Sequence, residues 1–270
     1  GAYLVLQNQL TAGAMIAASI LLGRALAPIE MAIGQWPLVQ RARLGWTSLA
    51  QLLSEVPPEA PRTGLLKPKA NLSAENLFVT CPDKGQTVLK NVTFNTTSGT
   101  AVGVIGPSGA GKSSLARAIT GAWKPASGCV RLDGAELEHY GSEALGCHIG
   151  YLPQLVRLFD GTIAENIARL DPNMESAKVI EAAKRAGAHD MIQCLSDGYD
   201  TAITANEIGL SGGQLQRIGL ARAMYNDPVI VVLDEPNSNL DNEGSLALNA
   251  AIRSLKDAGS SVLIMAHRPS

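Results

Sequence analysis

The stretch that most constrains this chain is GPSGAGKSS, residues 106–114, which crowds three glycines ahead of a lysine and two serines. It follows the apolar run AVGVI (101–105) and precedes SSLARAITGA (113–122), which is typical of a helix. Glycine lets the backbone approach a ligand closely, and the N–H groups at a helix start attract anions. This strand–loop–helix setting predicts a phosphate-binding loop that holds a nucleotide, and it disfavours a glycine-rich turn without a ligand.

Individual side chains in this loop have distinct predicted roles. Lys112 is expected to reach the β- and γ-phosphates, and the Ser113 hydroxyl is expected to ligate magnesium (Mg2+). The predicted nucleotide contacts of the loop are Gly106, Pro107, Ser108, Gly109, Ala110, Gly111, Lys112, Ser113 and Ser114.

Two adjacent carboxylates end the apolar run VIVVLDEP, residues 229–236. Ligands of parallel sheets bind at the carboxyl ends of strands, and neighbouring strand residues point to opposite sides. One carboxylate can therefore hold the metal while the next reaches an attacking water. We expect Asp234 to bind the Mg2+ and Glu235 to act as the general base.

A second anion site is predicted in LSGGQLQRIGLARA, residues 210–223. Ser211 is a good N-cap, and the two glycines after it expose the first helical N–H groups. The predicted contacts are Ser211, Gly212, Gly213 and Gln214. One chain cannot easily direct this site and the first loop at the same phosphate, whereas two chains arranged head to tail can.

The fold class follows from short apolar runs that alternate with helical stretches. The runs IGYL (149–152), VIVVL (229–233) and SVLIM (261–265) are continuous, as in strands buried on both faces. One intervening helix repeats apolar residues at i, i+3, i+4 and i+7: Val179, Ala182, Ala183 and Ala186. These patterns predict an α/β domain with a mostly parallel central sheet that is covered on both sides.

The first 23 residues carry no charge, which is long enough to cross a bilayer. We interpret residues 1–6 as the end of one membrane helix, residues 7–11 as a turn, and Ala12 as the start of a second helix. Arg24 and Glu30 lie within this second helix, where charges usually face a bundle interior, and Pro28 should kink it. Basic residues at 41 and 43 suit a cytoplasmic flank. The alternative is a soluble, alanine-rich helical hairpin.

The proline-rich stretch VPPEAPRTG, residues 56–64, is typical of a linker. We expect residues 1–56 to be the end of a membrane domain, 57–69 a linker and 70–270 a nucleotide-binding domain. The chain lacks an initial Met and ends soon after His267, so we expect a piece of a longer protein. A formal net charge of −2 at pH 7 and the lack of a basic stripe argue against nucleic-acid binding.

Together, GPSGAGKS, LSGGQ and VIVVLDEP resemble the ATP-binding-cassette (ABC) family, from about residue 70 onward. The resemblance implies a P-loop NTPase fold with a helical subdomain, ATP and Mg2+ as ligands, and a head-to-tail homodimer. Gln154 in YLPQ resembles the glutamine that senses Mg2+ and links to the membrane domain. Asp241 in SNLD resembles the acid of the loop at the dimer seam, and His267 the switch histidine that contacts the γ-phosphate. The catalytic set implied is Glu235, His267, Gln154 and Lys112.

A narrower resemblance concerns LFDGTIAENI (158–167) and the first 36 residues, which look like type I secretion permease/ATPases. It implies a multi-pass inner-membrane protein with its nucleotide-binding domain in the cytoplasm. It also implies a periplasmic adaptor protein, an outer-membrane channel and a secreted protein as cargo. An exporter of lipids or peptides and a soluble cassette ATPase are the alternatives.

The chain departs from the exporter pattern next to Pro82. Exporters often carry a tyrosine that stacks on adenine where this sequence has Cys81. Phe78 is a nearby aromatic residue that could compensate.

Overall fold

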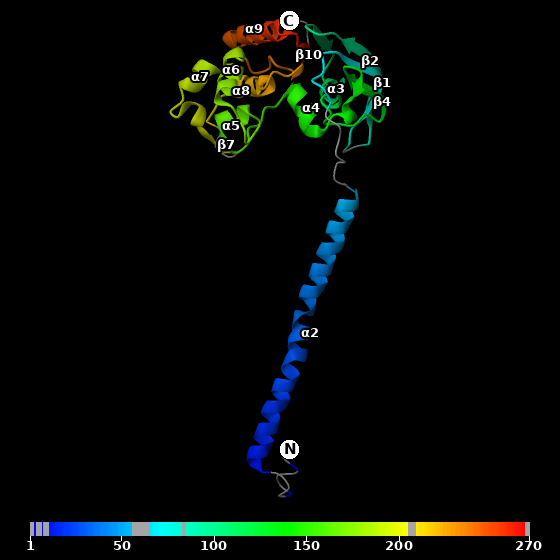
Figure 1. The fold of residues 1–270 in the computed structure, drawn as a ribbon, viewed down its shortest axis with the longest axis vertical. Helices are drawn as coiled ribbons and strands as arrows, with labels where there is room; N and C mark the ends of the chain where they lie inside the picture. The colour runs from blue at the N-terminus through cyan, green and yellow to red at the C-terminus, as the bar shows by residue number, and fades with distance from the viewer. Residues whose placement is uncertain are drawn as a thin grey trace. The chain divides into compact units, whose positions relative to one another are not determined.

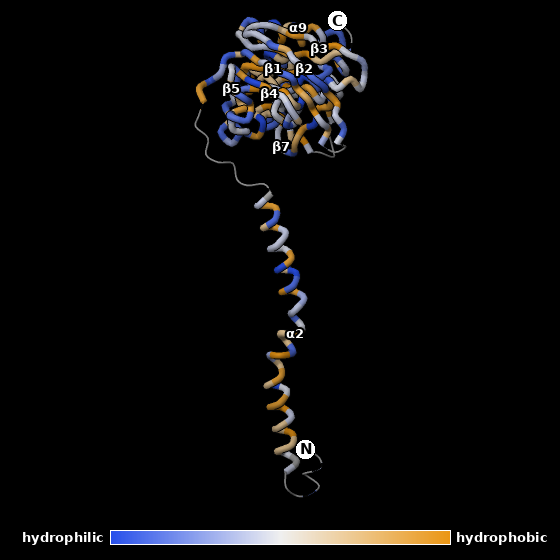
Figure 2. The backbone as a smooth tube through the Cα atoms, turned by 90° about the vertical axis from the view of Figure 1, so that its right-hand side faces the viewer, coloured by the Kyte–Doolittle hydropathy of each residue, from blue (hydrophilic) through white to orange (hydrophobic). Residues whose placement is uncertain are grey.

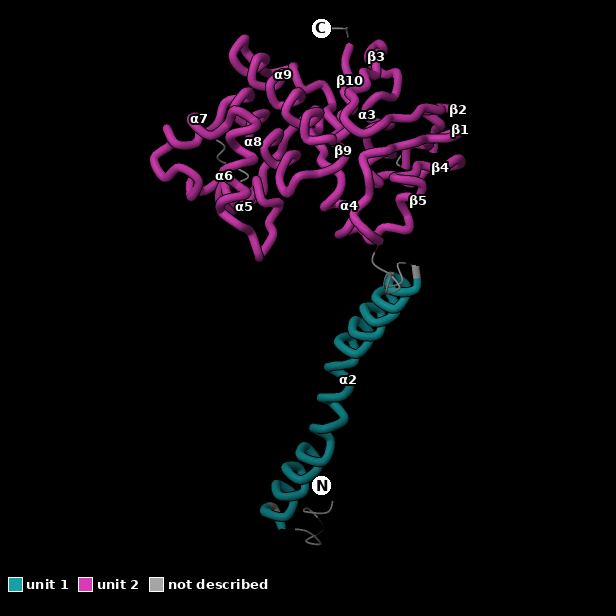
Figure 3. The backbone as a smooth tube through the Cα atoms, turned by 45° about the horizontal axis from the view of Figure 1, so that its top comes forward, with its two compact units in different colours: residues 1–61 teal, residues 62–270 magenta. Residues whose placement is uncertain are grey.

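The computed structural model describes residues 3, 7, 11–55, 65–82, 85–204 and 209–267. The chain divides into two compact units, Gly1–Pro61 and Arg62–Ser270 (Figure 3). Of the predicted linker, only residues 65–69 are described.

Unit 1 contains one long helix, α2 (Ala12–Glu55), whose 44 residues include Pro28 and Pro37. The helix begins where the sequence predicts, but it continues far beyond Trp36. The residues after Pro37 explain the extension, because they are rich in leucine, arginine, glutamine and alanine, which favour helices. The segment 13–54 is long and apolar enough to cross a membrane, and an 18-residue window within it has a mean hydropathy of 1.6. Figure 2 shows that its apolar residues are concentrated in the N-terminal half. The predicted preceding helix lies outside the described residues, apart from Tyr3.

A four-stranded parallel sheet forms the centre of unit 2, in the order β3-β10-β9-β6. Every neighbouring pair in this sheet is parallel, which confirms the predicted sheet. All five residues of β9 are buried, as expected for a continuous apolar run between two other strands. The strands are β3 (Ala101–Ile105), β6 (Ile149–Leu152), β9 (Ile230–Asp234) and β10 (Ser261–Ala266).

A second, antiparallel sheet lies beside the first, and the sequence patterns did not predict it. Its order is β2-β1-β4-β5. Irregular register between Ala74 and Leu77, where Asn76 takes a positive φ of 47°, interrupts the alternation that would have marked β1 as a strand. Helix α3 (Lys112–Ile119) buries Leu115 and Ile119 in one hydrophobic cluster with residues of both sheets. The strands are β1 (Leu72–Thr80), β2 (Thr87–Thr96), β4 (Ser127–Leu132) and β5 (Ala135–Glu136).

Helices α5 to α8 gather at the opposite side of unit 2 from β1, β2 and β4 (Figure 1). Their shared core contains the predicted apolar face of α6, with Val179, Ala182, Ala183 and Ala186 all buried. The helices are α4 (Ser142–His148), α5 (Ile163–Ile167), α6 (Ser176–Arg185), α7 (His189–Gln193), α8 (Gly212–Met224) and α9 (Asn242–Asp257). The short elements are β7 (Gly161–Thr162), β8 (Ala202–Ile203) and the 3-10 helices η1 (Leu137–His139) and η2 (Gly198–Asp200).

Gly150 shows how closely α8 approaches the central sheet. A Cβ atom on Gly150 of β6 would lie 2.0 Å from the carbonyl oxygen of Ala223 on α8. The obstacle is backbone, so Gly150→Ala should lower the free energy of unfolding by at least about 1–3 kcal/mol in urea titrations. Gly146→Ala, on the neighbouring helix α4 with open space around the Cβ, is the matched control and should not destabilise the protein. Equal stability of the two variants would contradict this packing.

Candidate nucleotide-binding and catalytic site

The predicted phosphate loop connects β3 to α3, as the sequence indicates. Gly111 precedes the first helical residue with a φ of 93°, in the left-handed region that favours glycine. A Cβ atom there would also lie 2.7 Å from Leu89 of β2. The buried Lys112 side chain turns back over the loop, where its Nζ atom donates to the carbonyl oxygens of Gly106 at 2.9 Å and Pro107 at 3.0 Å. The ammonium group is therefore held within the loop that is predicted to bind phosphate.

Asp234 ends β9 with only 1% of its surface exposed. Burial raises the pKa of its carboxyl group, and a hydrogen bond from the Ser113 hydroxyl opposes that rise. Its Oδ1 atom is buried without a hydrogen-bond partner among the described residues. A buried carboxylate oxygen beside a serine hydroxyl suits an oxygen-seeking cation such as Mg2+, so these two residues fit the predicted metal.

The Glu235 carboxylate is contacted from two sides. The Gln154 amide nitrogen donates to Oε2 at 2.9 Å, and His267 Nε2 lies 2.6 Å from Oε1. His267 Nδ1 in turn lies 3.4 Å from Lys112 Nζ, which has only protons to donate. The ring nitrogen Nδ1 is therefore the acceptor, and Nε2 carries the proton that faces Glu235. The four predicted catalytic residues thus form one connected group.

The reason that Asp234 and Glu235 diverge is not the predicted alternation along a strand. Strand β9 ends at Asp234, and Glu235 takes a φ of 51°. The chain therefore turns between the two carboxylates, which leaves Asp234 buried and directs Glu235 to Gln154 and His267. The predicted alternation is therefore wrong for Glu235, which lies outside the strand, although the two side chains do diverge.

A cavity of about 210 Å³ lies beside this group. Gly106, Pro107, Ala110 and Asp234 do not line it. The residues that do are Val88, Ser108, Gly109, Gly111, Lys112, Ser113, Ser114, Gln154, Glu235 and His267.

Val88 of β2 is the apolar residue of this lining, and the sequence analysis missed it. Neither Cys81, at the usual position of the aromatic residue that stacks on adenine, nor Phe78, its possible replacement, lines the cavity. The strand that carries Val88 could have been located only by recognising the irregular antiparallel sheet.

The residues of the second predicted anion site do not line the cavity. Ser211 is the N-cap of α8, where its Oγ atom accepts from the Gln214 N–H at 3.3 Å. The Gln214 side chain accepts from the Ser211 N–H at 2.8 Å, completing a reciprocal cap. Ser211 and Gly212 are exposed, so this helix start is accessible at the surface of unit 2.

Asp241 is the N-cap of α9 and does not reach the cavity. Its Oδ1 atom accepts from the Gly244 N–H at 2.7 Å and lies 3.3 Å from Arg217 on α8. The Gly244 N–H, followed by the Arg217 charge, lowers the pKa of Asp241.

Comparison with known proteins agrees with this geometry. The sequence model described as ABC transporter matches residues 89–238, which is more than half of the chain. The chain belongs to the ABC transporter family. Unit 2 is therefore an ABC ATPase domain that binds ATP, and the parallel sheet and helical group described above are its fold.

Curated relatives place this ABC transporter chain close to secretion proteins. It is 50% identical over 270 residues to "Type I secretion system ATP-binding protein PrsD" of Rhizobium meliloti, covering all of this chain and 46% of that protein. It is 36% identical over 272 residues to "Alpha-hemolysin translocation ATP-binding protein HlyB" of Proteus vulgaris, covering 38% of that protein. The leukotoxin translocation protein LktB of Mannheimia haemolytica shows the same identity and coverage. The chain thus spans less than half the length of these relatives.

Among solved structures, an Atm1-family ABC exporter from a bacterium, with ATP bound, matches with a TM-score of 0.81 and 28% identity. The match covers 96% of this chain and 46% of the other. This ABC transporter chain therefore has the fold of the matching part of an ABC exporter.

Asp241→Ala should lower the midpoint of thermal unfolding at pH 7, because it removes a helix cap and an ion pair. The pKa of Asp241 is lowered in the folded protein, so its carboxylate stabilises the fold above about pH 4 and loses this effect as the pH falls further. The difference between wild type and variant should therefore narrow below about pH 4, as followed by circular dichroism.

Glu243→Ala is the control for this prediction, because its carboxylate is 84% exposed and lies 3.7 Å from Arg217. It should change the midpoint little at any pH. A loss for Asp241→Ala that is the same at pH 3 and pH 7 would contradict the assignment.

Proposed function

We propose that this chain is the ATP-driven part of a type I secretion exporter, which moves a protein cargo across the inner membrane. The observation that carries the proposal is the Glu235 carboxylate at the cavity wall, contacted by Gln154 and His267 beside Lys112. This arrangement suits in-line attack of water on a terminal phosphate, since catalysis there is mainly positioning and electrostatic stabilisation. Identity of 50% to a type I secretion protein over all 270 residues supports the cargo class.

In this proposal the phosphate loop binds the triphosphate through its backbone N–H groups. Lys112 exchanges its contacts with the Gly106 and Pro107 carbonyls for contacts with the β- and γ-phosphates. Glu235 accepts a proton from the attacking water, and the Nε2 proton of His267 orients the carboxylate. Gln154 links this group to the segment that follows β6, which makes it suited to report hydrolysis elsewhere in the protein.

We propose Ser113, Asp234 and Gln154 as the residues that hold Mg2+. When bound, the ion would neutralise charge on the phosphates. The unpartnered Oδ1 of Asp234 supports this role, because a cation would satisfy it.

We also propose that two chains act as a head-to-tail homodimer. In each site, Ser211, Gly212, Gly213 and Gln214 of one copy would contact the nucleotide on the loop of the other. The start of α8 is exposed and capped, and it does not line the cavity of its own chain. Both observations support its assignment to the nucleotide bound by the other copy.

The membrane part of the proposal concerns residues 1–56, as the end of a multi-pass domain joined by a linker (57–69) to the ATPase domain (70–270). Helix α2 supports it through its length and hydropathy. Arg41 and Arg43 on its C-terminal half suit a cytoplasmic flank. A periplasmic adaptor and an outer-membrane channel would complete the path for the cargo.

Glu235→Gln should bind ATP with near-normal affinity but lower kcat for hydrolysis by about 10²–10⁴-fold, because the amide cannot accept the proton. The variant should accumulate as an ATP-dependent dimer, as measured by phosphate release and light scattering. Glu181→Gln, at an exposed position on α6, is the charge-matched control and should hydrolyse ATP normally. Turnover of Glu235→Gln at the wild-type rate would exclude Glu235 as the base.

The chain should remain in the membrane fraction after alkaline carbonate washing, because α2 is long and apolar enough to cross a bilayer. A variant that begins at residue 57 should be released, as followed by immunoblotting. Recovery of the whole chain in the soluble fraction without detergent would favour the soluble ATPase alternative.

A further inference from the structure

Gln216 is a buried polar residue whose contacts are not explained by a capping or nucleotide-binding role. It lies on α8, with 2% of its surface exposed. Its amide nitrogen donates to the carbonyl oxygen of Pro236 at 3.0 Å, and its amide oxygen accepts from the Asn239 side chain at 3.3 Å. Both ends of one side chain therefore contact the segment that immediately follows Glu235.

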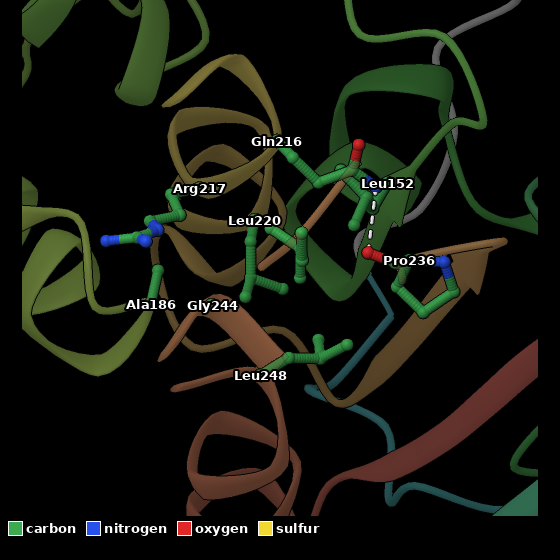
Figure 4. Close-up of a pocket in the computed structure, with 9 residues that line it drawn as sticks. Leu152, Ala186, Gln216, Arg217, Leu220, Pro236, Gly244 and Leu248 are labelled. Atoms are coloured by element: carbon green, nitrogen blue, oxygen red, sulfur yellow. Dashed lines mark hydrogen bonds between the residues drawn. The ribbon is translucent and has the colours of Figure 1, made fainter. Parts of the chain in front are cut away.

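The surroundings of Gln216 are mostly apolar, as Figure 4 shows, with Leu152, Leu220 and Leu248 in the same pocket. The dashed line there marks its hydrogen bond to Pro236. A buried carbonyl that loses its donor costs free energy, and a leucine side chain cannot replace that donor. The position of the Pro236 carbonyl therefore depends on the Gln216 amide.

Two further contacts hold the same segment against α8. A Cβ atom on Gly213 would lie 3.1 Å from the Asn239 carbonyl oxygen, so the two backbones are close. Arg217, the neighbour of Gln216, pairs with Asp241 at 3.3 Å. Residues 236–241 thus lie against the first two turns of α8.

Glu235 itself needs such support. It takes a φ of 51°, an unusual conformation for a residue with a side chain. Its own backbone hydrogen bonds are to Met265 at 3.0 Å and from Ser238 at 3.2 Å. A strained conformation persists only when the surrounding structure determines it, and Pro236 is the next residue in the chain.

We propose that Gln216 is a positioning residue for ATP hydrolysis, which sets the Glu235 carboxylate by holding Pro236 and Asn239 against α8. The inference rests on the proposed function, since it assigns Glu235 the role of base. Helix α8 also begins at Ser211, which in the proposed dimer contacts the nucleotide bound to the other copy. Gln216 therefore connects Glu235 of one ATP site to Ser211 of the other.

Gln216→Met tests the proposal in the full-length protein, since methionine has a similar volume but cannot make either hydrogen bond. We expect kcat for ATP hydrolysis to fall by about 10- to 100-fold, as for a small displacement of a reacting group. KM for ATP with Mg2+ should stay within about twofold, because the phosphate loop is untouched.

Asn239→Ala is a second, exposed-site variant that removes one of the two hydrogen bonds without altering the core. It should lower kcat less than Gln216→Met does. In the double variant, Asn239→Ala should lower kcat no further than Gln216→Met does alone, because the effects of residues that act as a unit are not additive.

Ser260→Ala is the matched control, since the buried Ser260 hydroxyl also donates to a proline carbonyl, that of Pro228 at 2.9 Å. It should lower the thermal unfolding midpoint but leave kcat unchanged. If Gln216→Met and Asn239→Ala behave like Ser260→Ala while Glu235→Gln is inactive, Gln216 is only structural and the inference fails. If wild type does not hydrolyse ATP, or Glu235→Gln is fully active, the proposed function fails and the inference with it.

Discussion

The parallel pairing of β9 between β6 and β10 is the constraint on which the rest of the site depends. Parallel strands end at the same edge of a sheet, so residues far apart in the chain meet there. Gln154 follows β6, Glu235 follows β9, and His267 follows β10, while the phosphate loop follows β3. The hydrogen bonds among these side chains are possible only because all four strands run in one direction. The site is therefore a consequence of the sheet rather than an addition to it.

The sequence was sufficient to predict the parts of the fold in which local pattern and tertiary role agree. The continuous apolar runs of β6, β9 and β10 predicted buried parallel strands, and the spacing of Val179, Ala182 and Ala183 predicted the buried face of α6. The antiparallel sheet could not be predicted in the same way. Its strand β1 contains a register shift at Asn76, and its pairing with β4 joins residues far apart in the chain, such as Leu72 with Leu132 and Phe78 with Ser127. Such pairing depends on packing that periodicity does not record.

The candidate site shows the same division between residue identity and geometry. Motifs identified Lys112 and Ser113 at the end of a glycine-rich loop, and Asp234 and Glu235 at the end of a strongly apolar run. The left-handed conformation of Glu235 and the place of Val88 in the cavity lining could be identified only from the structure, since neither has a local sequence signal. Gln216 lies in the same sequence stretch as the second predicted anion site, but no local pattern predicts a role for it. Only the structure indicates that its amide contacts Pro236 and Asn239, twenty or more positions away.

The two neighbouring carboxylates have different surroundings, and this difference supports different roles. Asp234 is buried, its pKa is raised by that burial, and one of its oxygens has no partner among the described residues. Glu235 has a hydrogen-bond donor at each oxygen and lines the cavity. A cation bound beside Ser113 would compensate the desolvated charge of Asp234, whereas it would gain less at Glu235, whose oxygens already have partners. The same turn of the backbone that separates the two side chains therefore also separates the proposed metal ligand from the proposed base, and different surroundings are a common way to assign two chemical roles to like groups.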